Sequence, residues 1–448
     1  MKKFVALLCV SLLLFTATGC TSNNTPTETT TPDTEPQVLK VAGLDGGYGT
    51  SGWEAVVAAF EAQEGVTVEL QLEKNIDEIL RPVIVSGRDI PDVIYLSYGA
   101  KGGLTATMAA ENQIVNITDV FDMTIPGEEV TVNDKITPGL TSAISSSPYG
   151  DGEVYLAPVF YAPTGLFYNA GLFEEKGWEV PTTWDEMWAL GDLAKEEGIA
   201  LFTYPVAGYF DAFFSALLNQ TAGPEVYERL MNYDTSAWEL PEVKEAFEIV
   251  GKLATYVEES TVSNANGEGF TKNQQLILDN KALFVPNGTW LPGEMADAPR
   301  ADNFEWGFIA APTSNGNDRY STTFTEQVYI PSGAENVDLA KKFIAFLYSD
   351  VATKLFLENT SDGAVMPVEG ATALISDETV KQYYALYEEG VKPNAVGFVT
   401  VEPVEGVVIP GGTGILYGTI NSVVNGTKTV DEWYQDVLDG VAQYDPNR

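Results

Sequence analysis

Histidine is missing from all 448 residues of this sequence. Without an imidazole the chain cannot form a Ser-His-Asp or Cys-His catalytic site, and it cannot bind zinc through histidine. The commonest general base near neutral pH is absent as well. Most enzyme classes are therefore excluded, and we predict a protein with no metal site, no cofactor and no catalytic activity.

Cysteine is nearly absent too, because Cys9 and Cys20 are the only two in the chain. Both precede the part of the sequence that has the composition of a folded body. That body accordingly has neither disulfides nor a thiol nucleophile.

Basic residues are scarce, with 24 Lys and Arg against 64 Asp and Glu, which gives a formal net charge of −40. Such a charge opposes binding to nucleic acid and to anionic lipid surfaces. We therefore predict no nucleic-acid partner. The charge keeps a protein soluble and unaggregated but does not identify a ligand.

The N-terminal apolar run, Phe4 to Ala17, is too short to span a bilayer. Lys2 and Lys3 precede it and Thr18, Gly19 and Cys20 follow, an order typical of a secretory signal. The segment resembles bacterial lipoprotein signals, which implies removal of residues 1–19 and lipidation of the Cys20 thiol. We expect residues 20–37, which are rich in Thr and Pro, to be a disordered tether that holds the protein on the extracytoplasmic side of the cell membrane.

The remaining chain is long enough for two domains and begins with alternating strand and helix patterns. This alternation predicts an α/β fold with a mostly parallel sheet and helices on both faces. Expected strands are Val38–Leu44, Val66–Leu72 and Asp92–Leu96, and expected helices are Trp53–Glu64, with Ser51 as its cap, and Ile76–Ser86.

Two loops follow strands of this sheet directly, where open α/β sheets bind ligands. Gly47 and Tyr48 follow the first strand, and Ser97 and Tyr98 follow the third. The first loop also matches G-x-G-x-x-G, but a lone match is weak evidence for a dinucleotide site, and a secreted protein meets little NAD. We retain the four residues as candidate ligand contacts of another kind.

The stretch from 159 to 218 combines well-marked helix signals with many aromatic residues. Thr183 and Glu186 have the spacing of a capping box, which predicts a helix start. Tyr161, Tyr209 and Phe210 are among the aromatics at the ends of its elements. Aromatic faces with polar tips suit sugars, although core packing is the alternative for each of them.

A second aromatic candidate follows the predicted strand Ala282–Val285. The next residues include Asn287 and Trp290, and Trp290 is the strongest candidate for stacking on a ligand ring. The alternative is a tryptophan that fills a gap beneath the loop.

Several stretches together resemble bacterial extracellular solute-binding proteins of the carbohydrate importer class, of the maltose-binding type. The stretches that carry the resemblance are PDVIYLS (Pro91 to Ser97), GLFYNAGLFEEKGWEVPTTWDEMWAL (Gly165 to Leu190), VPNGTWLPGEM (Val285 to Met295) and AKKFIAFLYSDVATK (Ala340 to Lys354).

The resemblance implies a two-lobe, hinged, periplasmic-binding-protein-like fold of type II with the ligand cleft between the lobes. It places residues 38–158 and 313–363 in lobe 1 and residues 159–312 and 364–448 in lobe 2. It further implies a monomer that delivers a carbohydrate to the permease subunits of an ABC importer. Asp211 and Glu326 would accept hydrogen bonds from sugar hydroxyls. Within the family, the likeness is greatest to members assigned to N-acetylglucosamine or chitobiose uptake.

Two other functions stay open at this point. A lipid-anchored glycoside hydrolase needs two carboxylates around the scissile bond and does not require a histidine. A binder of peptides or polyamines would depend mainly on acidic side chains in the cleft. Neither function is excluded by composition.

Overall fold

The structure is a computed structural model that describes residues 37–444 apart from 47, 101, 142–143, 315, 317, 361–363, 395–396, 400 and 402. The expected signal peptide, most of the tether, the lipidation site Cys20 and the candidate Gly47 therefore lie outside the described residues. Residues Gln37–Arg448 form one compact unit. In the described part of the chain, no helix is both long and apolar enough to cross a membrane.

A nine-stranded sheet runs through the described body, in the order β2-β1-β3-β8-β4-β6-β5, with β7 beside β4 and β9 beside β8. The strands are β1 (Val38–Leu44), β2 (Thr67–Glu73), β3 (Val93–Tyr95), β4 (Ala157–Asn169), β5 (Ala200–Phe202), β6 (Ala282–Gly288), β7 (Trp306–Ile309), β8 (Tyr320–Tyr329) and β9 (Lys392–Asn394).

The sheet is mixed, which corrects the expectation of a mostly parallel one. β1 is parallel to β2 and β3, as the strand and helix alternation predicts. β4 and β8 are long strands that pair antiparallel to each other, and β4 is also antiparallel to β6 and β7. These two strands connect elements far apart in the sequence. The local alternation of strands and helices therefore did not indicate that they pair antiparallel.

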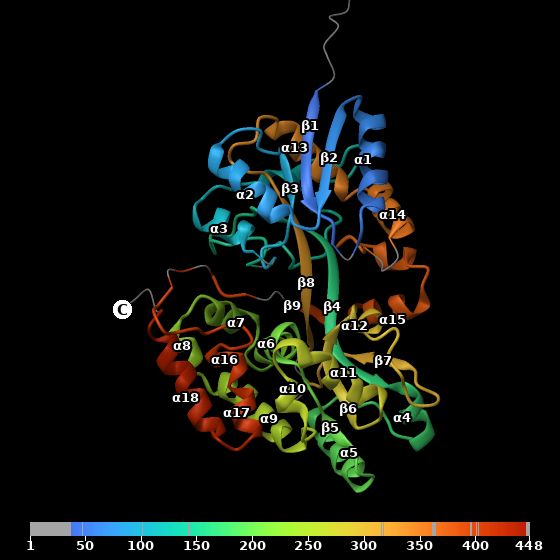
Figure 1. Ribbon diagram of the computed structural model, residues 1–448, viewed down its shortest axis with the longest axis vertical. Helices are drawn as coiled ribbons and strands as arrows, with labels where there is room; N and C mark the ends of the chain where they lie inside the picture. Colours follow the sequence, from blue (N-terminus) through green and yellow to red (C-terminus); the bar gives the residue numbers. More distant parts are fainter. Residues whose placement is uncertain are drawn as a thin grey trace, which may run out of the picture. The chain divides into compact units, whose positions relative to one another are not determined.

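Helices cover the sheet in two groups, one around β1 to β3 and one around β5 to β7 (Figure 1). They are α1 (Ser51–Glu64), α2 (Ile76–Ser86), α3 (Leu104–Ala110), α4 (Ala170–Lys176), α5 (Trp184–Glu196), α6 (Asp211–Ala222), α7 (Pro224–Met231), α8 (Thr235–Trp238), α9 (Pro241–Leu253), α10 (Thr261–Asn264), α11 (Phe270–Leu278), α12 (Leu291–Glu294), α13 (Val337–Leu347), α14 (Asp350–Asn359), α15 (Glu378–Glu388), α16 (Ile415–Gly418), α17 (Ile420–Val424) and α18 (Val430–Val441). Short helical turns are η1 (Thr118–Asp122), η2 (Val206–Phe210), η3 (Ala254–Tyr256), η4 (Gly267–Gly269) and η5 (Ala371–Leu374).

Capping residues set the starts of several helices. α5 begins with the predicted capping box, in which Thr183 accepts from the Glu186 amide and Glu186 accepts from the Thr183 amide. α18 begins with an equivalent box at Thr429. The predicted cap at Ser51 is wrong, because α1 begins at Ser51 itself and its N-cap Thr50 makes no side-chain cap bond.

β4 and β8 belong to both groups of elements, which we call the first half (around β1 to β3) and the second half (around β5 to β7). At one end β8 pairs with β3, and at the other β4 pairs with β6 and β7. Figure 1 shows the two strands running side by side between the halves.

Two backbone hydrogen bonds lie close to the expected lobe boundaries, which remain a prediction. The amide of Thr313 donates to the carbonyl of Thr182 (2.9 Å), so residue 313 lies with the second half. The amide of Thr137 donates to the carbonyl of Pro367 (2.8 Å), so that segment lies with the first half. The expected crossing near Gly363 falls outside the described residues.

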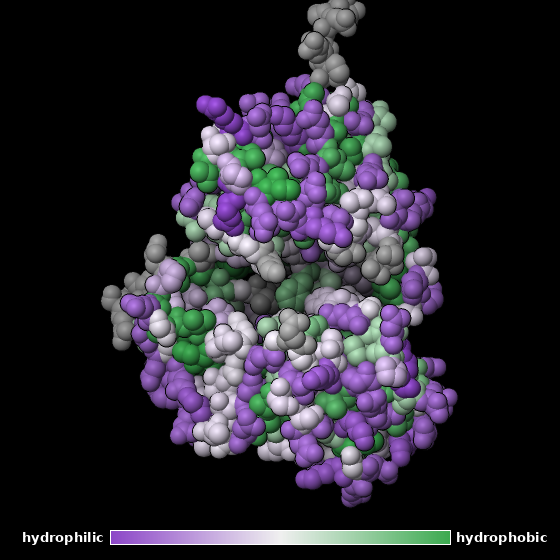
Figure 2. Space-filling model, viewed as in Figure 1, coloured by the Kyte–Doolittle hydropathy of each residue, from purple (hydrophilic) through white to green (hydrophobic). Residues whose placement is uncertain are grey.

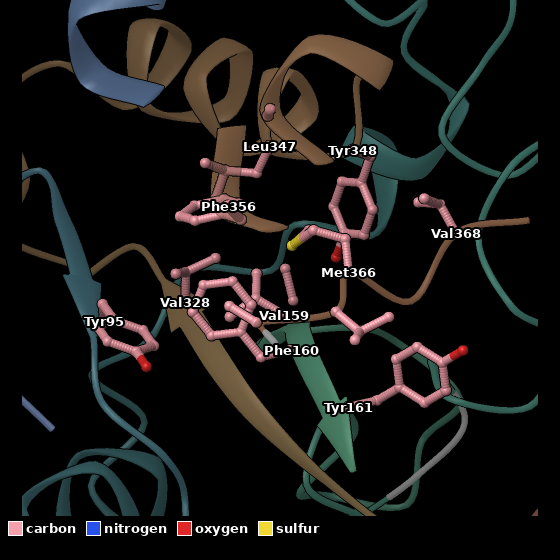
Figure 3. Packing of buried hydrophobic residues seen from close by; sticks show 14 of the residues in the cluster. Tyr95, Val159, Phe160, Tyr161, Val328, Leu347, Tyr348, Phe356, Met366 and Val368 are labelled. Carbon is pink, nitrogen blue, oxygen red and sulfur yellow. The ribbon is translucent and has the colours of Figure 1, made fainter. Parts of the chain in front are cut away.

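A β-bulge in β4 positions the core where the two halves meet. The register of β4 against β8 shifts between Val159 and Tyr161, and Phe160 between them has a φ of 39°. A bulky residue rarely adopts positive φ, so the surrounding packing must hold it there. Figure 3 shows the resulting cluster, in which Val159, Phe160 and Tyr161 lie near Tyr95, Val328, Leu347, Tyr348, Phe356, Met366 and Val368.

Candidate functional site

A cavity of about 470 Å³, which we call the first pocket, lies where the two halves meet along β4 and β8. Figure 2, which has the same view as Figure 1, shows a hollow across the middle of the molecule, with apolar residues in green at its floor. The cavity is lined by Leu44, Tyr48, Ser97, Tyr98, Gly99, Ala100, Ser145, Phe160, Ala162, Trp290, Thr323, Phe324, Thr325, Glu326 and Gln327.

The first half supplies one wall of the first pocket, formed by residues that follow the ends of strands. Tyr48 follows β1, and its ring centroid lies 4.9 Å from that of Phe160. Phe160 is itself held edge-to-face against Trp53 and Phe356. This wall therefore rests on aromatic side chains of the core that fix its position.

Ser97 and Glu326 form the polar centre of the pocket. Ser97 Oγ donates a hydrogen bond to Glu326 Oε2, which joins the end of β3 to β8. Burial raises the pKa of the Glu326 carboxyl, and the bond from Ser97 opposes part of that rise. Among the described residues that line the pocket, Glu326 is the only one with an ionisable carboxylate.

Gln327 holds Tyr98 at the same edge. Its Oε1 accepts from the Tyr98 amide (2.7 Å), and its Nε2 donates to Thr325 Oγ1 (2.7 Å). Since both ends of the Gln327 side chain are bonded, the backbone that presents Tyr98 is fixed relative to β8.

The second half and β8 supply the aromatic wall opposite. Trp290 follows β6, and its ring lies edge-to-face against Phe324 of β8, with centroids 5.6 Å apart and an interplanar angle of 67°. Phe324 is 36% exposed, so it offers an apolar face to the cavity. A Cβ at Gly288 would lie 2.1 Å from two atoms of the Trp290 ring, so only glycine leaves room for the indole in this position.

Three predicted site residues lie in the interior and do not line the pocket. Phe210 is 1% exposed and packs on Tyr204 and Phe214. Tyr161 is 4% exposed and contacts Tyr384, whose hydroxyl donates to the Tyr161 carbonyl (2.6 Å).

Asn287 is the third and is fully buried at the end of β6. Its Oδ1 accepts from the Gly288 amide (2.8 Å), while its Nδ2 has no hydrogen-bond partner among the described residues. The side chain therefore supports the turn that carries Trp290.

Tyr209 and Asp211 lie at the start of α6 and also do not line the pocket. The Tyr209 hydroxyl donates to Glu294 Oε1 (3.2 Å), and its ring stacks on Phe270 with centroids 5.9 Å apart. Asp211 accepts from the amides of Gly208 (2.9 Å) and Ala212 (2.8 Å). Burial raises the pKa of Asp211 to about 6, although these amide bonds oppose the rise.

Sequence reasoning missed much of β8. It found Glu326 but not Phe324, Thr325 or Gln327, which line the cavity beside it. The two-residue alternation of a strand gave no signal for them, because all five consecutive residues from Thr323 to Gln327 line the pocket. The pairing of β8 with both β3 and β4 decided which of its residues face the cavity.

A comparison with protein families identifies this architecture. The family model described as bacterial extracellular solute-binding protein matches residues 55–385. The chain belongs to this family. In a solute-binding protein, a cavity lined by a few polar groups on an aromatic frame holds the solute, and no reacting pair of side chains is needed. The family is extracellular, so the solute is met outside the cytoplasm.

Relatives of this solute-binding protein include named sugar binders. The diacetylchitobiose binding protein NgcE of Streptomyces coelicolor is 26% identical over 356 residues, which cover 75% of this chain and 73% of that protein. The melibiose/raffinose/stachyose-binding protein MelE of Bacillus subtilis is 23% identical over 443 residues, which cover 93% of this chain and 91% of that protein.

A solved structure supports the fold. The bacterial solute receptor AcbH, whose structure is described with a substrate preference for β-D-galactopyranose, matches with a TM-score of 0.65 and 18% identity. The match covers 91% of this chain and 98% of AcbH. It confirms the predicted α/β, periplasmic-binding-protein-like fold of this solute-binding protein.

Proposed function

We propose that this protein captures a sugar in the first pocket and delivers it to the permease subunits of an ABC importer. The observation that carries the proposal is the pairing of aromatic faces with one half-buried carboxylate in a cavity of about 470 Å³. Trp290 and Phe324 offer apolar faces at 67° to each other, which suit the C–H faces of a sugar ring. Ser97 and Glu326 lie nearby to bind its hydroxyls.

The chemistry of Glu326 fits a neutral ligand with several hydroxyl groups. An ionised carboxylate only accepts hydrogen bonds, and strong ones, so hydroxyl groups of the sugar are the natural donors. Ser97 already donates to one of its two oxygens. The other oxygen is then the one we expect a sugar hydroxyl to contact.

The relatives support a sugar as the solute. The names of NgcE and MelE specify diacetylchitobiose and melibiose, raffinose or stachyose, and the description of AcbH specifies galactopyranose. We favour an oligosaccharide, and an N-acetylglucosamine or chitobiose type of ligand is the first candidate.

Closure of two lobes about β4 and β8 would complete the site. In this proposal the lobe around β1 to β3, expected at about residues 38–158 and 313–363, moves against the lobe around β5 to β7, expected at about residues 159–312 and 364–448. A bound sugar favours the closed state because it contacts both lobes. Tyr209 and Asp211, at the start of α6, would then approach the ligand. The closed surface is what the permease would recognise.

We further propose that the protein acts as a monomer anchored through a lipid on Cys20, with residues 1–19 removed as a signal peptide. The short apolar run before Cys20 supports this. The site of action would be the extracytoplasmic face of the cell membrane.

The alternatives fit the cavity less well. A glycoside hydrolase needs two carboxylates about 5 to 9 Å apart, whereas Glu326 alone among the described lining residues carries one. A polyamine binder would require several acidic side chains around the ligand. The single carboxylate among the described lining residues therefore opposes that function as well.

A thermal-shift screen tests the proposal. The purified protein is mixed with mono- and oligosaccharides, peptides and polyamines, because a ligand that binds only the folded state raises its apparent stability. We expect a rise with one family of sugars, with the sugar recovered intact. A sugar recovered cleaved would favour the hydrolase, and shifts with peptides or amines alone would show that a sugar is not the solute.

A further inference from the structure

A cavity of about 330 Å³, which we call the second pocket, lies between the segment that leads into β4 and the pair formed by α7 and β9. Buried neutral polar side chains form much of its wall, namely Ser147, Asn219, Tyr227 and Asn394. Glu228, on the exposed side of α7, is the only charged residue among the described residues that line it. The wall therefore favours a neutral ligand over an ion.

Hydrogen bonds fix the orientation of Asn219 in this wall. Its Nδ2 donates to Asn394 Oδ1 (2.7 Å), and Asn394 Nδ2 donates to Thr322 Oγ1 (3.2 Å). Because the nitrogen of Asn219 is used in this chain of bonds, Oδ1 is the atom left for another donor. Asn219 is 5% exposed, and its Oδ1 has no hydrogen-bond partner among the described residues.

Ser147, which also lines the second pocket, repeats this pattern. It is 3% exposed, and its Oγ also lacks a hydrogen-bond partner in the described part of the chain. A buried polar atom without a partner costs about 1–3 kcal/mol. Two such atoms on one cavity indicate a place where a ligand carrying hydroxyl or amide groups gains hydrogen bonds that the protein does not supply itself.

The second pocket continues from the first. Ile144 lines the second pocket and the next residue, Ser145, lines the first. On β8, Tyr320 lines the second pocket and Thr323 lines the first, and three residues of strand span about 10 Å. The two cavities are therefore neighbours along one strand.

The position of Tyr98 also indicates that the two pockets are neighbours. It lines the first pocket and lies close enough to Tyr233 to affect its ionisation. Burial raises the pKa of Tyr233 to about 12, and the Tyr444 and Tyr98 hydroxyls add to the rise. Tyr233 directly follows Asn232, which lines the second pocket.

We propose that the second pocket is a distal subsite that holds a further sugar unit of a linear oligosaccharide whose first unit occupies the first pocket. A hydroxyl or acetamido N–H of that unit donates to Asn219 Oδ1, and Ser147 Oγ binds a second polar group. This inference rests on the proposed function and specifies its ligand as a chain of several units.

Calorimetric titration against two length series tests the subsite. One series is galactose, melibiose, raffinose and stachyose, and the other is N-acetylglucosamine and its β-1,4-linked dimer and trimer. For the series that binds, we expect affinity to rise with length. Asn219→Leu and Ser147→Ala should each lower the affinity for the longest member about tenfold and leave the shortest within twofold, as expected for one lost hydrogen bond.

Asn273→Leu is the matched control. Asn273 is also buried with an unpartnered Oδ1, but it lines neither pocket, so its loss should not alter the dependence on length. If Asn219→Leu fails to fold, Ser147→Ala still tests the proposal. The subsite alone would be overturned if affinity still rose with sugar length in both variants. It would also be overturned if the variants lost equal affinity for short and long sugars. Failure of every sugar to bind would overturn the proposed function together with it.

Discussion

The two walls of the first pocket are assembled in different ways. On the side of the first half, Tyr48, Ser97 and Tyr98 come from the ends of β1 and β3, which are parallel neighbours. On the side of the second half, Trp290 lines the pocket while Phe210 and Asn287, also at element ends, are buried.

The difference follows from the structure of each half. Parallel strands bring their carboxyl ends to one edge, so loops after them meet at the ligand. In the second half, the residue before α6 belongs to the kinked turn η2, in which Gly208 has a φ of 82°. The kink directs Phe210 into the core, and position at an element end therefore does not imply exposure there.

The largest expected effect contrasts two phenylalanines. Phe210→Ala should lower the free energy of unfolding by about 3–5 kcal/mol, because it empties a buried aromatic site. Phe324→Ala should lower it by less than about 1.5 kcal/mol, since Phe324 is 36% exposed. Urea denaturation measures both. Equal losses of unfolding free energy would contradict the assignment of Phe210 to the core and of Phe324 to the cavity wall.

Loss of the indole should affect binding more than folding. Trp290→Ala should weaken sugar binding by about 1–3 kcal/mol if the ring stacks on the ligand. Trp178→Ala is the control, because that half-buried tryptophan packs on Phe173 and does not line the pocket. Unchanged affinity with a lower melting temperature would assign Trp290 to the core.

A smaller effect is expected from displacing the same ring. Gly288→Ala places a methyl group where the indole now lies, so sugar binding should weaken by about 1 kcal/mol, less than on removal of the ring. Gly293→Ala is a matched control, because a Cβ there meets nothing within 4 Å. Calorimetry compares the two, and an equal effect would show that the position of Trp290 is not sensitive to Gly288.

An effect of similar size concerns pH. Asp211 has a pKa of about 6 in the folded state against 3.8 for the free group, so the folded state binds the proton first as the pH falls. Protonation of Asp211 should therefore add about 1 kcal/mol to the free energy of unfolding between pH 7 and pH 5.

Asp211→Asn should abolish this gain. The relevant quantity is the difference between the native protein and the variant, since burial also raises the pKa of Glu294 and Glu326. Parallel denaturation curves at the two pH values measure it. A difference that does not change with pH would mean that Asp211 is well solvated.

Features that depend on short-range interactions were predictable. The capping box at Thr183 was evident from residues three apart, because its two hydrogen bonds join neighbours in the chain, and the box at Thr429 has the same spacing. The loops that carry Tyr48, Ser97 and Tyr98 were also predictable, since the strand and helix alternation defines a parallel edge.

The contribution of β8 was less predictable. Glu326 was identified as a single acceptor, but its bond to Ser97 joins residues 229 apart in the chain. The aromatic contact of Phe324 with Trp290 likewise joins β8 to the turn after β6, which comes from a different part of the sequence. Such contacts depend on the order of strands in the sheet, which local patterns do not contain.

The sequence by itself determined the absence of imidazole chemistry, the α/β class and the starts of the two boxed helices, because composition is a property of the chain and caps involve only near neighbours. The tertiary structure alone decided that β4 and β8 pair antiparallel, that Phe210 and Tyr161 are buried and that Phe324 lines the cavity. Exposure of an aromatic side chain depends on which distant segments cover it, and that is settled only when the whole sheet and its helices pack together.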